Sequence, residues 1–113
     1  MRLKSEIWVH ALLRRCFVAG LFGAVLRKGA AEAGAIYIVI NRLDGTVKLL
    51  GPPPGSAIDE AGERLWAETV PPVTQATEVT RFIEKMAKFD PDFWVVEIED
   101  RTGTAGLTVI APE

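Results

Sequence analysis

The sequence predicts an α+β fold in a single domain over residues 1–113, with a mainly antiparallel sheet built on a central hairpin over about residues 35–51. Two apolar runs flank Asp44-Gly45, and two other segments, about 5–19 and 74–89, show helical spacing. The chain has 113 residues, 49% hydrophobic and 25% charged, which is ordinary globular composition and enough for a core without disulfides or metals.

The hairpin is predicted from Asp44-Gly45, because a two-residue type I′ turn needs positive φ at both positions. This turn would pair Ile40 with Leu49. One face would then carry Ile38, Ile40, Val47 and Leu49, and the other would carry Tyr37, Val39, Asn41, Lys48 and Leu50. Apolar side chains on both faces of residues 35–40 indicate a central strand that is covered on each side.

The first predicted helix begins at Ser5, which is a plausible N-cap, and ends at Gly20. A strand over residues 6–13 stays open as an alternative, because apolar residues also alternate there. In the second helix, Val79, Phe82 and Met86 repeat at helical spacing, with Thr74 as the expected cap.

Four further strands complete the prediction. Residues 22–28, 64–68 and 93–99 have strand composition, and residues 107–110 are expected to form a short edge strand. Within 93–99, Trp94, Val96 and Ile98 point to one face, and Val95, Glu97 and Glu99 point to the other. Three prolines at 52–54 end the hairpin ladder, because proline has no N–H to donate.

The apolar run over residues 16–26 raises the question of a membrane segment or a signal peptide. Its eleven residues are too few to span a bilayer, which takes about 20. Arg27 and Lys28 lie between the run and any cleavage site, which disfavours a signal peptide. The single cysteine, Cys16, cannot form an internal disulfide, so we expect a cytoplasmic protein without membrane attachment.

The chemical inventory disfavours most enzyme classes. His10 is the only histidine, one histidine and one cysteine cannot form a zinc site, and no phosphate-binding glycine motif is present. We therefore predict no cofactor, no metal site and no catalytic residues. The alternative is a small enzyme or divalent-cation binder that uses the carboxylates from Asp90 to Asp100, with Glu97 and Glu99 on one strand face. A solvated acidic face explains the same pattern.

A second alternative uses the charge distribution. Residues 1–54 contain eight basic and three acidic residues, whereas residues 55–113 contain five basic and twelve acidic residues. A weak binding site for single-stranded nucleic acid could use Trp8 or Tyr37 as stacking surfaces, together with the basic residues Arg14, Arg15, Arg27, Lys28 and Arg42. A pI near 5.5 and the lack of a known RNA-binding motif disfavour this function.

The favoured prediction is a non-enzymatic interaction domain whose partner is a second copy of the chain or an unidentified protein. Three tryptophans in a small chain are either core residues or interface anchors. The candidate binding or interface residues are Trp8, Arg14, Arg15, Tyr37, Asn41, Lys48, Glu97 and Glu99.

Three segments resemble a known family: RLKSEIWVHALLRRC, AGAIYIVINRLDGTVKLLGP and FDPDFWVVEIEDR. They are similar to short bacterial proteins of the alphaproteobacterial type that are known only as a domain of unknown function. The resemblance covers essentially the whole chain. It implies a compact cytoplasmic domain that stands alone, and it implies no activity, ligand or catalytic residue.

Overall fold

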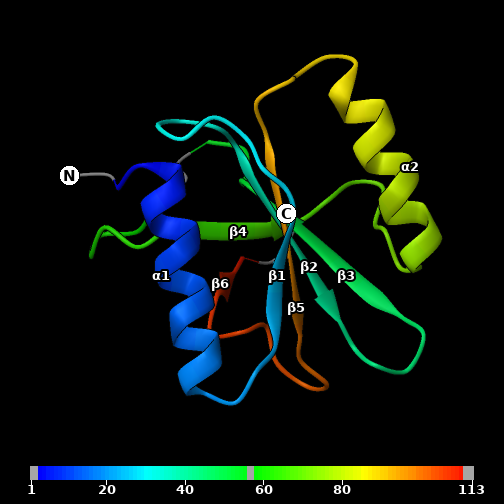
Figure 1. Cartoon of the computed structure of the whole chain (residues 1–113), viewed down its shortest axis with the longest axis horizontal. Coiled ribbons are helices and arrows are strands. Elements are labelled where there is room, and N and C mark those ends of the chain that lie inside the picture. The colour runs from blue at the N-terminus through cyan, green and yellow to red at the C-terminus, as the bar shows by residue number, and fades with distance from the viewer. Residues whose placement is uncertain (1–2, 56–57, 111–113) are drawn as a thin grey trace.

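A computed structural model describes residues 3–55 and 58–110. Two helices, α1 (Ser5–Val18) and α2 (Ala76–Ala87), lie on opposite faces of one sheet (Figure 1). The strands are β1 (Gly23–Arg27), β2 (Ile36–Asn41), β3 (Val47–Gly51), β4 (Leu65–Glu68), β5 (Trp94–Glu99) and β6 (Thr108–Val109). The predicted α+β class and its elements are confirmed, and residues 5–13 are helix rather than strand.

The sheet has the strand order β1-β5-β2-β3-β4-β6 and is mixed. β1–β5, β2–β3 and β3–β4 are antiparallel, as expected, but β2–β5 and β4–β6 are parallel. The prediction of a mainly antiparallel sheet was therefore only partly right. Parallel neighbours need a long crossover, and the chain from β3 through β4 and α2 supplies it between β2 and β5.

β2 is central and is covered on both faces, as predicted. Ile36, Ile38 and Ile40 are buried in the core under α1, together with Leu12 of that helix. Val39 is buried in a second core under α2, together with Val79. The sheet therefore separates two apolar cores, each of which holds one helix against it.

The hairpin register differs by one residue from the prediction. Asn41 pairs with Val47 and Val39 pairs with Leu49, so three residues, 43–45, form the loop instead of two. Leu43 (φ 62°) and Gly45 (φ 93°) adopt the left-handed region. The Asn41 Oδ1 atom accepts a hydrogen bond from the Leu43 N–H at 2.8 Å, which stabilises the unusual conformation of Leu43.

This shift moves side chains between the two faces, because strand side chains alternate with a period of two. Val47 and Leu49 lie under α2, and not with Ile38 and Ile40 as predicted. Lys48 pairs with Ile40 and shares its face. The predicted polar group of Tyr37, Asn41 and Lys48 on one face is therefore wrong.

Both predicted helix caps are also wrong by one residue. Lys4 is the N-cap of α1, and the buried Ser5 donates its hydroxyl hydrogen bond to the Gly34 carbonyl at 2.7 Å instead. α2 begins after Gln75, which forms a capping box with Glu78. The end of α1 is as predicted: Gly20 has φ 82° and the Leu21 N–H bonds the Cys16 carbonyl at 2.8 Å.

The three tryptophans are core residues. Trp8 stacks on Trp66 with 5.3 Å between ring centroids, and both side chains are buried. Trp94 is buried and its indole N–H donates to the Ala30 carbonyl at 2.8 Å. The three tryptophans therefore stabilise the α1 side of the sheet and do not form an exposed surface.

The observed register is testable at Gly51, which lies beside the Tyr37 ring. A Cβ added at Gly51 would lie 2.6 Å from the Tyr37 Cε2 atom. We expect Gly51→Ala to lower the free energy of unfolding by about 1–3 kcal/mol in urea denaturation, because the ring must shift in a packed core. Tyr37→Leu should remove at least half of that cost when the two changes are combined. Equal costs in both backgrounds would contradict the register.

Candidate interaction surfaces

The predicted site residues do not converge on one site. Trp8 is in the core, and Arg14 and Arg15 are exposed on α1. Tyr37 is half-buried on the α2 side, where its ring lies 5.2 Å from Phe82, and burial raises the pKa of its hydroxyl. Lys48 lies on the α1 side of the sheet.

The parallel pairing of β2 with β5 does bring Asn41, Glu97 and Glu99 together. Glu99 lies opposite Asn41 and Glu97 opposite Val39, and the Asn41 amide donates to the Glu97 Oε2 atom at 3.5 Å. Both carboxylates are partly exposed. Across residues 3–55 and 58–110, no three or more acidic, histidine or cysteine side chains are grouped so that they could hold a metal ion.

Asp100, the last acid of the predicted carboxylate group, organises a loop. Its carboxylate accepts backbone hydrogen bonds from Thr102, Gly103 and Ala105, and Arg42 donates to the Asp100 and Gly103 carbonyls. The bond from the Gly103 N–H is the main cause that lowers the pKa of Asp100 below its usual range. Asp100 and Arg42 are therefore structural residues.

The basic residues of the N-terminal half are likewise dispersed. Arg27 stacks 4.4 Å from the centroid of the Phe93 ring and donates to the Pro91 carbonyl at 2.9 Å. Trp8 is buried and Tyr37 packs under α2, so neither of the two predicted stacking residues is exposed beside Arg14 or Arg15. The predicted basic and aromatic arrangement for nucleic acid is not assembled.

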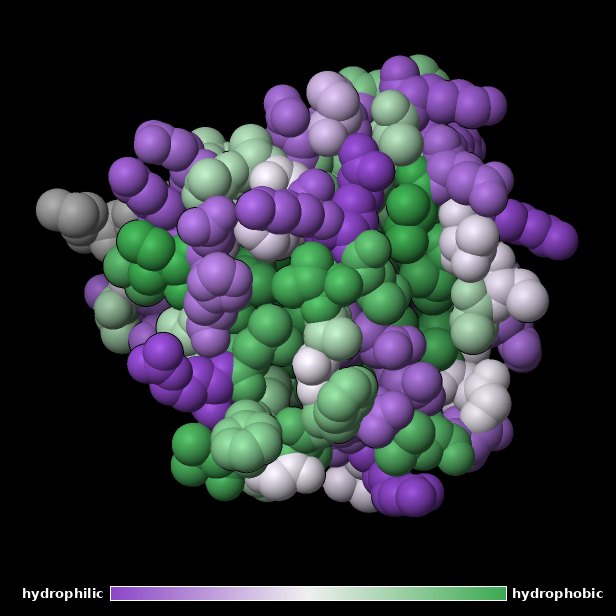
Figure 2. Space-filling model, viewed as in Figure 1, coloured by the Kyte–Doolittle hydropathy of each residue, from purple (hydrophilic) through white to green (hydrophobic). Residues whose placement is uncertain are grey.

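Sequence reasoning missed an apolar surface along β1. In the described residues β1 pairs with β5 alone and forms one edge of the sheet. Figure 2 shows hydrophobic residues gathered between the two helices, over β1, and below the end of α1. The exposed apolar residues there are Phe17 (82%), Val18 (82%), Phe22 (63%), Leu26 (48%) and Val25 (37%).

The main chain of β1 defines which groups face outward. The Phe22 carbonyl accepts a hydrogen bond from the Glu99 N–H at 2.8 Å, and Ala24 lies opposite Glu97. Because antiparallel pairs alternate in direction, the N–H and C=O groups of Gly23 and Val25 point away from β5. A bulge between Val25 and Arg27 ends this regular stretch.

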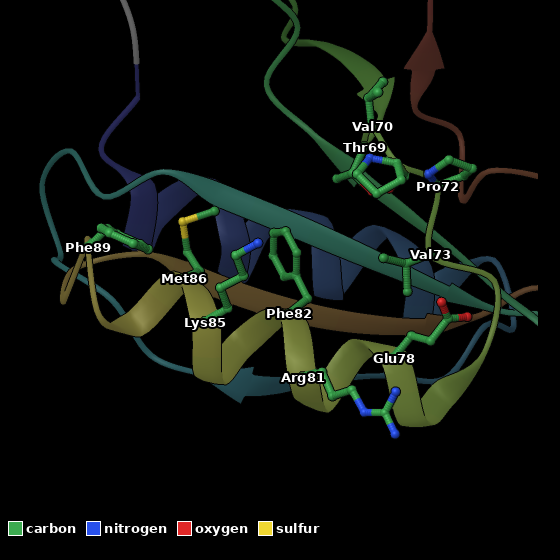
Figure 3. A pocket seen from close by; sticks show the side chains of 11 residues that line it. Thr69, Val70, Pro72, Val73, Glu78, Arg81, Phe82, Lys85, Met86 and Phe89 are labelled. Carbon is green, nitrogen blue, oxygen red and sulfur yellow. The ribbon is translucent and has the colours of Figure 1, made fainter.

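A second apolar surface is the groove between α2 and the loop over residues 69–73, which we call the α2 groove (Figure 3). Its volume is about 410 Å³. Val70 is 90% exposed and Phe89 is 79% exposed, although both are large apolar residues. Helical periodicity had placed Phe82 and Met86 facing the sheet, and gave no signal that the 69–73 loop would form a second wall.

The geometry defines a small α+β domain, two helices around a mixed sheet, with two exposed apolar surfaces. The chain belongs to the family described as protein of unknown function (DUF1491), whose model matches residues 3–108. This confirms the family resemblance seen in the sequence. No protein of curated function matches the chain.

Solved structures of relatives have the same fold over nearly their whole length. Protein Atu0922 from A. tumefaciens, solved in solution, is 43% identical with a TM-score of 0.79, covering 100% of this chain and 98% of that one. A crystal structure of a DUF1491 family protein from Caulobacter crescentus CB15 is 38% identical with a TM-score of 0.78, covering 98% and 100%. Within the described ranges, no helix has the length and apolar character needed to cross a membrane.

The loop role of Asp100 predicts a pH dependence of stability. Since the folded-state pKa is lowered, the carboxylate stabilises the fold above its unfolded pKa, and this contribution is lost as pH falls through the folded pKa. We expect Asp100→Asn to be less stable than the wild type at about pH 7, and the difference in urea midpoint to shrink towards about pH 3.

The matched control for Asp100 is Glu60→Gln, which neutralises an exposed carboxylate. It should show a small difference from the wild type at both pH values. A difference between wild type and Asp100→Asn that stays constant across the acid range would contradict the assigned role of the Asp100 charge.

Proposed function

We propose that this chain is a non-enzymatic interaction domain that self-associates through the edge of β1. The observation that carries this proposal is the row of outward main-chain groups on Gly23 and Val25, bordered by exposed apolar side chains. An edge strand with free N–H and C=O groups is a template for another strand. A second copy of the chain offers the same edge.

The β1 edge has few of the features that prevent edge strands of monomeric proteins from pairing with other chains. Natural edge strands are commonly blocked by lysine, proline, inward charges or bulges. In β1 the sole charge is Arg27, whose guanidinium is turned inward to Phe93 and Pro91, and the bulge lies at the C-terminal end. The segment from Phe22 to Val25 is therefore open to pairing.

If two copies of β1 pair antiparallel about a two-fold axis at Ala24, the outward main-chain groups of both strands find partners. Gly23 would then lie opposite Val25 of the partner subunit, and each such pair exchanges both of its N–H and C=O groups in an antiparallel ladder. Phe22 and Leu26 share a face of the sheet with Ala24, since strand side chains alternate up to the bulge. Pairing would cover part of their exposed apolar area and so favour the dimer.

Val25→Pro tests this mode of association. Proline removes the outward N–H of Val25 and leaves the β1–β5 hydrogen bonds of Phe22 and Ala24 intact, because those groups belong to other residues. We expect the wild type to sediment as a dimer in equilibrium with monomer, and Val25→Pro to weaken the dimer by at least about tenfold. Sedimentation velocity over a concentration series gives the dimer dissociation constants of the wild type and of Val25→Pro.

Val25→Thr is the control, because it keeps the N–H and nearly the same shape and should retain the dimer. Near-ultraviolet circular dichroism, which reports on the buried Trp66 and Trp94, should be unchanged in all three proteins. A wild-type chain that remains monomeric at about 1 mM would refute self-association. A dimer that Val25→Pro leaves unaffected would refute the β1 edge as its interface.

A further inference from the structure

The α2 groove is a preformed apolar site on a different part of the molecule from the β1 edge. Its apolar lining consists of Val70, Pro71, Pro72, Val73, Phe82, Met86 and Phe89. The volume of about 410 Å³ is in the range of ligand-binding pockets, and apolar side chains make up most of the wall. The groove is open to solvent along one side (Figure 3).

Both walls of the groove are held in place. The 69–73 loop is attached to β3 at each end, by the Thr69 N–H to the Leu49 carbonyl at 3.0 Å and the Val47 N–H to the Thr74 carbonyl at 2.9 Å. On the other wall, the ring of Phe82 packs edge-on against Tyr37 at 5.2 Å. A site built on such supports needs little rearrangement when it binds, which lowers the entropic cost.

The charges around the groove are unbalanced in favour of cations. Glu78 is the one acid of the lining, and its carboxylate accepts hydrogen bonds from Thr74 and Gln75 at the start of α2. Arg81 and Lys85 also line the groove, and neither lies in an ion pair with an acid among the described residues. In Figure 3 the Lys85 ammonium group points the same way as Phe82 and Met86, whereas the Arg81 guanidinium points away.

We propose that the α2 groove binds a short apolar segment of another protein that carries an acidic side chain. The lining residues of α2, from Glu78 to Met86, extend over about two helical turns, roughly 12 Å, and Phe89 continues the lining in the turn after the helix. An extended segment of about four residues spans this stretch of α2. Its apolar side chains would pack between Val70 and Phe89, and its carboxylate would pair with Lys85.

This partner chemistry follows from the combination of the apolar floor and the cationic rim. A free inorganic anion would leave the apolar walls exposed, and a nucleic acid strand would bring more phosphate charge than Lys85 offsets. A basic segment would meet Lys85 with like charge, which opposes binding. An acidic, apolar segment satisfies both features of the groove.

The test uses a phage-displayed library of random dodecapeptides, selected on the full chain carrying Val25→Pro. This target separates the groove from any association through β1. We expect the enriched peptides to combine aspartate or glutamate with leucine, isoleucine or phenylalanine. The double variant Val70→Ser/Phe89→Ser removes two exposed groups, and so spares the core, and should weaken the selected peptides by about tenfold or more.

Reversing the charge of the groove tests the proposal more directly than removing its apolar groups. Selection on Lys85→Glu should enrich basic peptides in place of acidic ones, whereas Arg14→Glu on α1, across the sheet, should leave the original peptides bound. No enrichment, enrichment without acidic residues, or peptides that bind Val70→Ser/Phe89→Ser as tightly as the parent would each overturn the proposal. These outcomes do not depend on the dimer, because the target lacks the Val25 N–H.

Discussion

The position of β5 between β1 and β2 is the constraint on which the rest of the structure depends. Six consecutive residue pairs join β5 to β2 in parallel, and both faces of β5 are buried, with Val96 and Ile98 under α1 and Val95 under α2. This insertion leaves β1 at the edge of the sheet and makes β2 the centre. It also sets Glu97 and Glu99 beside Asn41, so one pairing accounts for the core, the edge and the polar cluster.

The sequence predicted the local elements well, because each depends on side-chain periodicity within one segment. Both helices, the central strand and the alternation of β5 followed from such patterns. The strand order did not follow from these patterns. Alternation shows that β5 has two different faces, but it does not show which strands flank β5. The hairpin register was missed because Leu43 takes a left-handed conformation, which branched residues rarely adopt and which the Asn41 side chain stabilises here.

The candidate functional residues were predicted less well than the helices and strands. Residues chosen for their chemistry, such as Trp8 and Tyr37, pack in or against the core. The two proposed surfaces are instead built from aliphatic and phenyl groups, including Val25, Val70 and Phe89, that sequence patterns cannot distinguish from core residues. Exposure of these groups depends on strand order and on the path of the 69–73 loop, which are properties of the whole fold.

The central claim, that β1 is an edge that pairs with a second copy, is tested most directly by amide hydrogen exchange resolved by residue. At low protein concentration the Val25 amide should exchange rapidly, and the Ala24 amide, which faces β5, should be protected. When concentration is raised until the dimer predominates, exchange at Val25 should slow by at least about tenfold while Ala24 changes little. Rapid, concentration-independent exchange at Val25 in a dimeric sample would contradict the account.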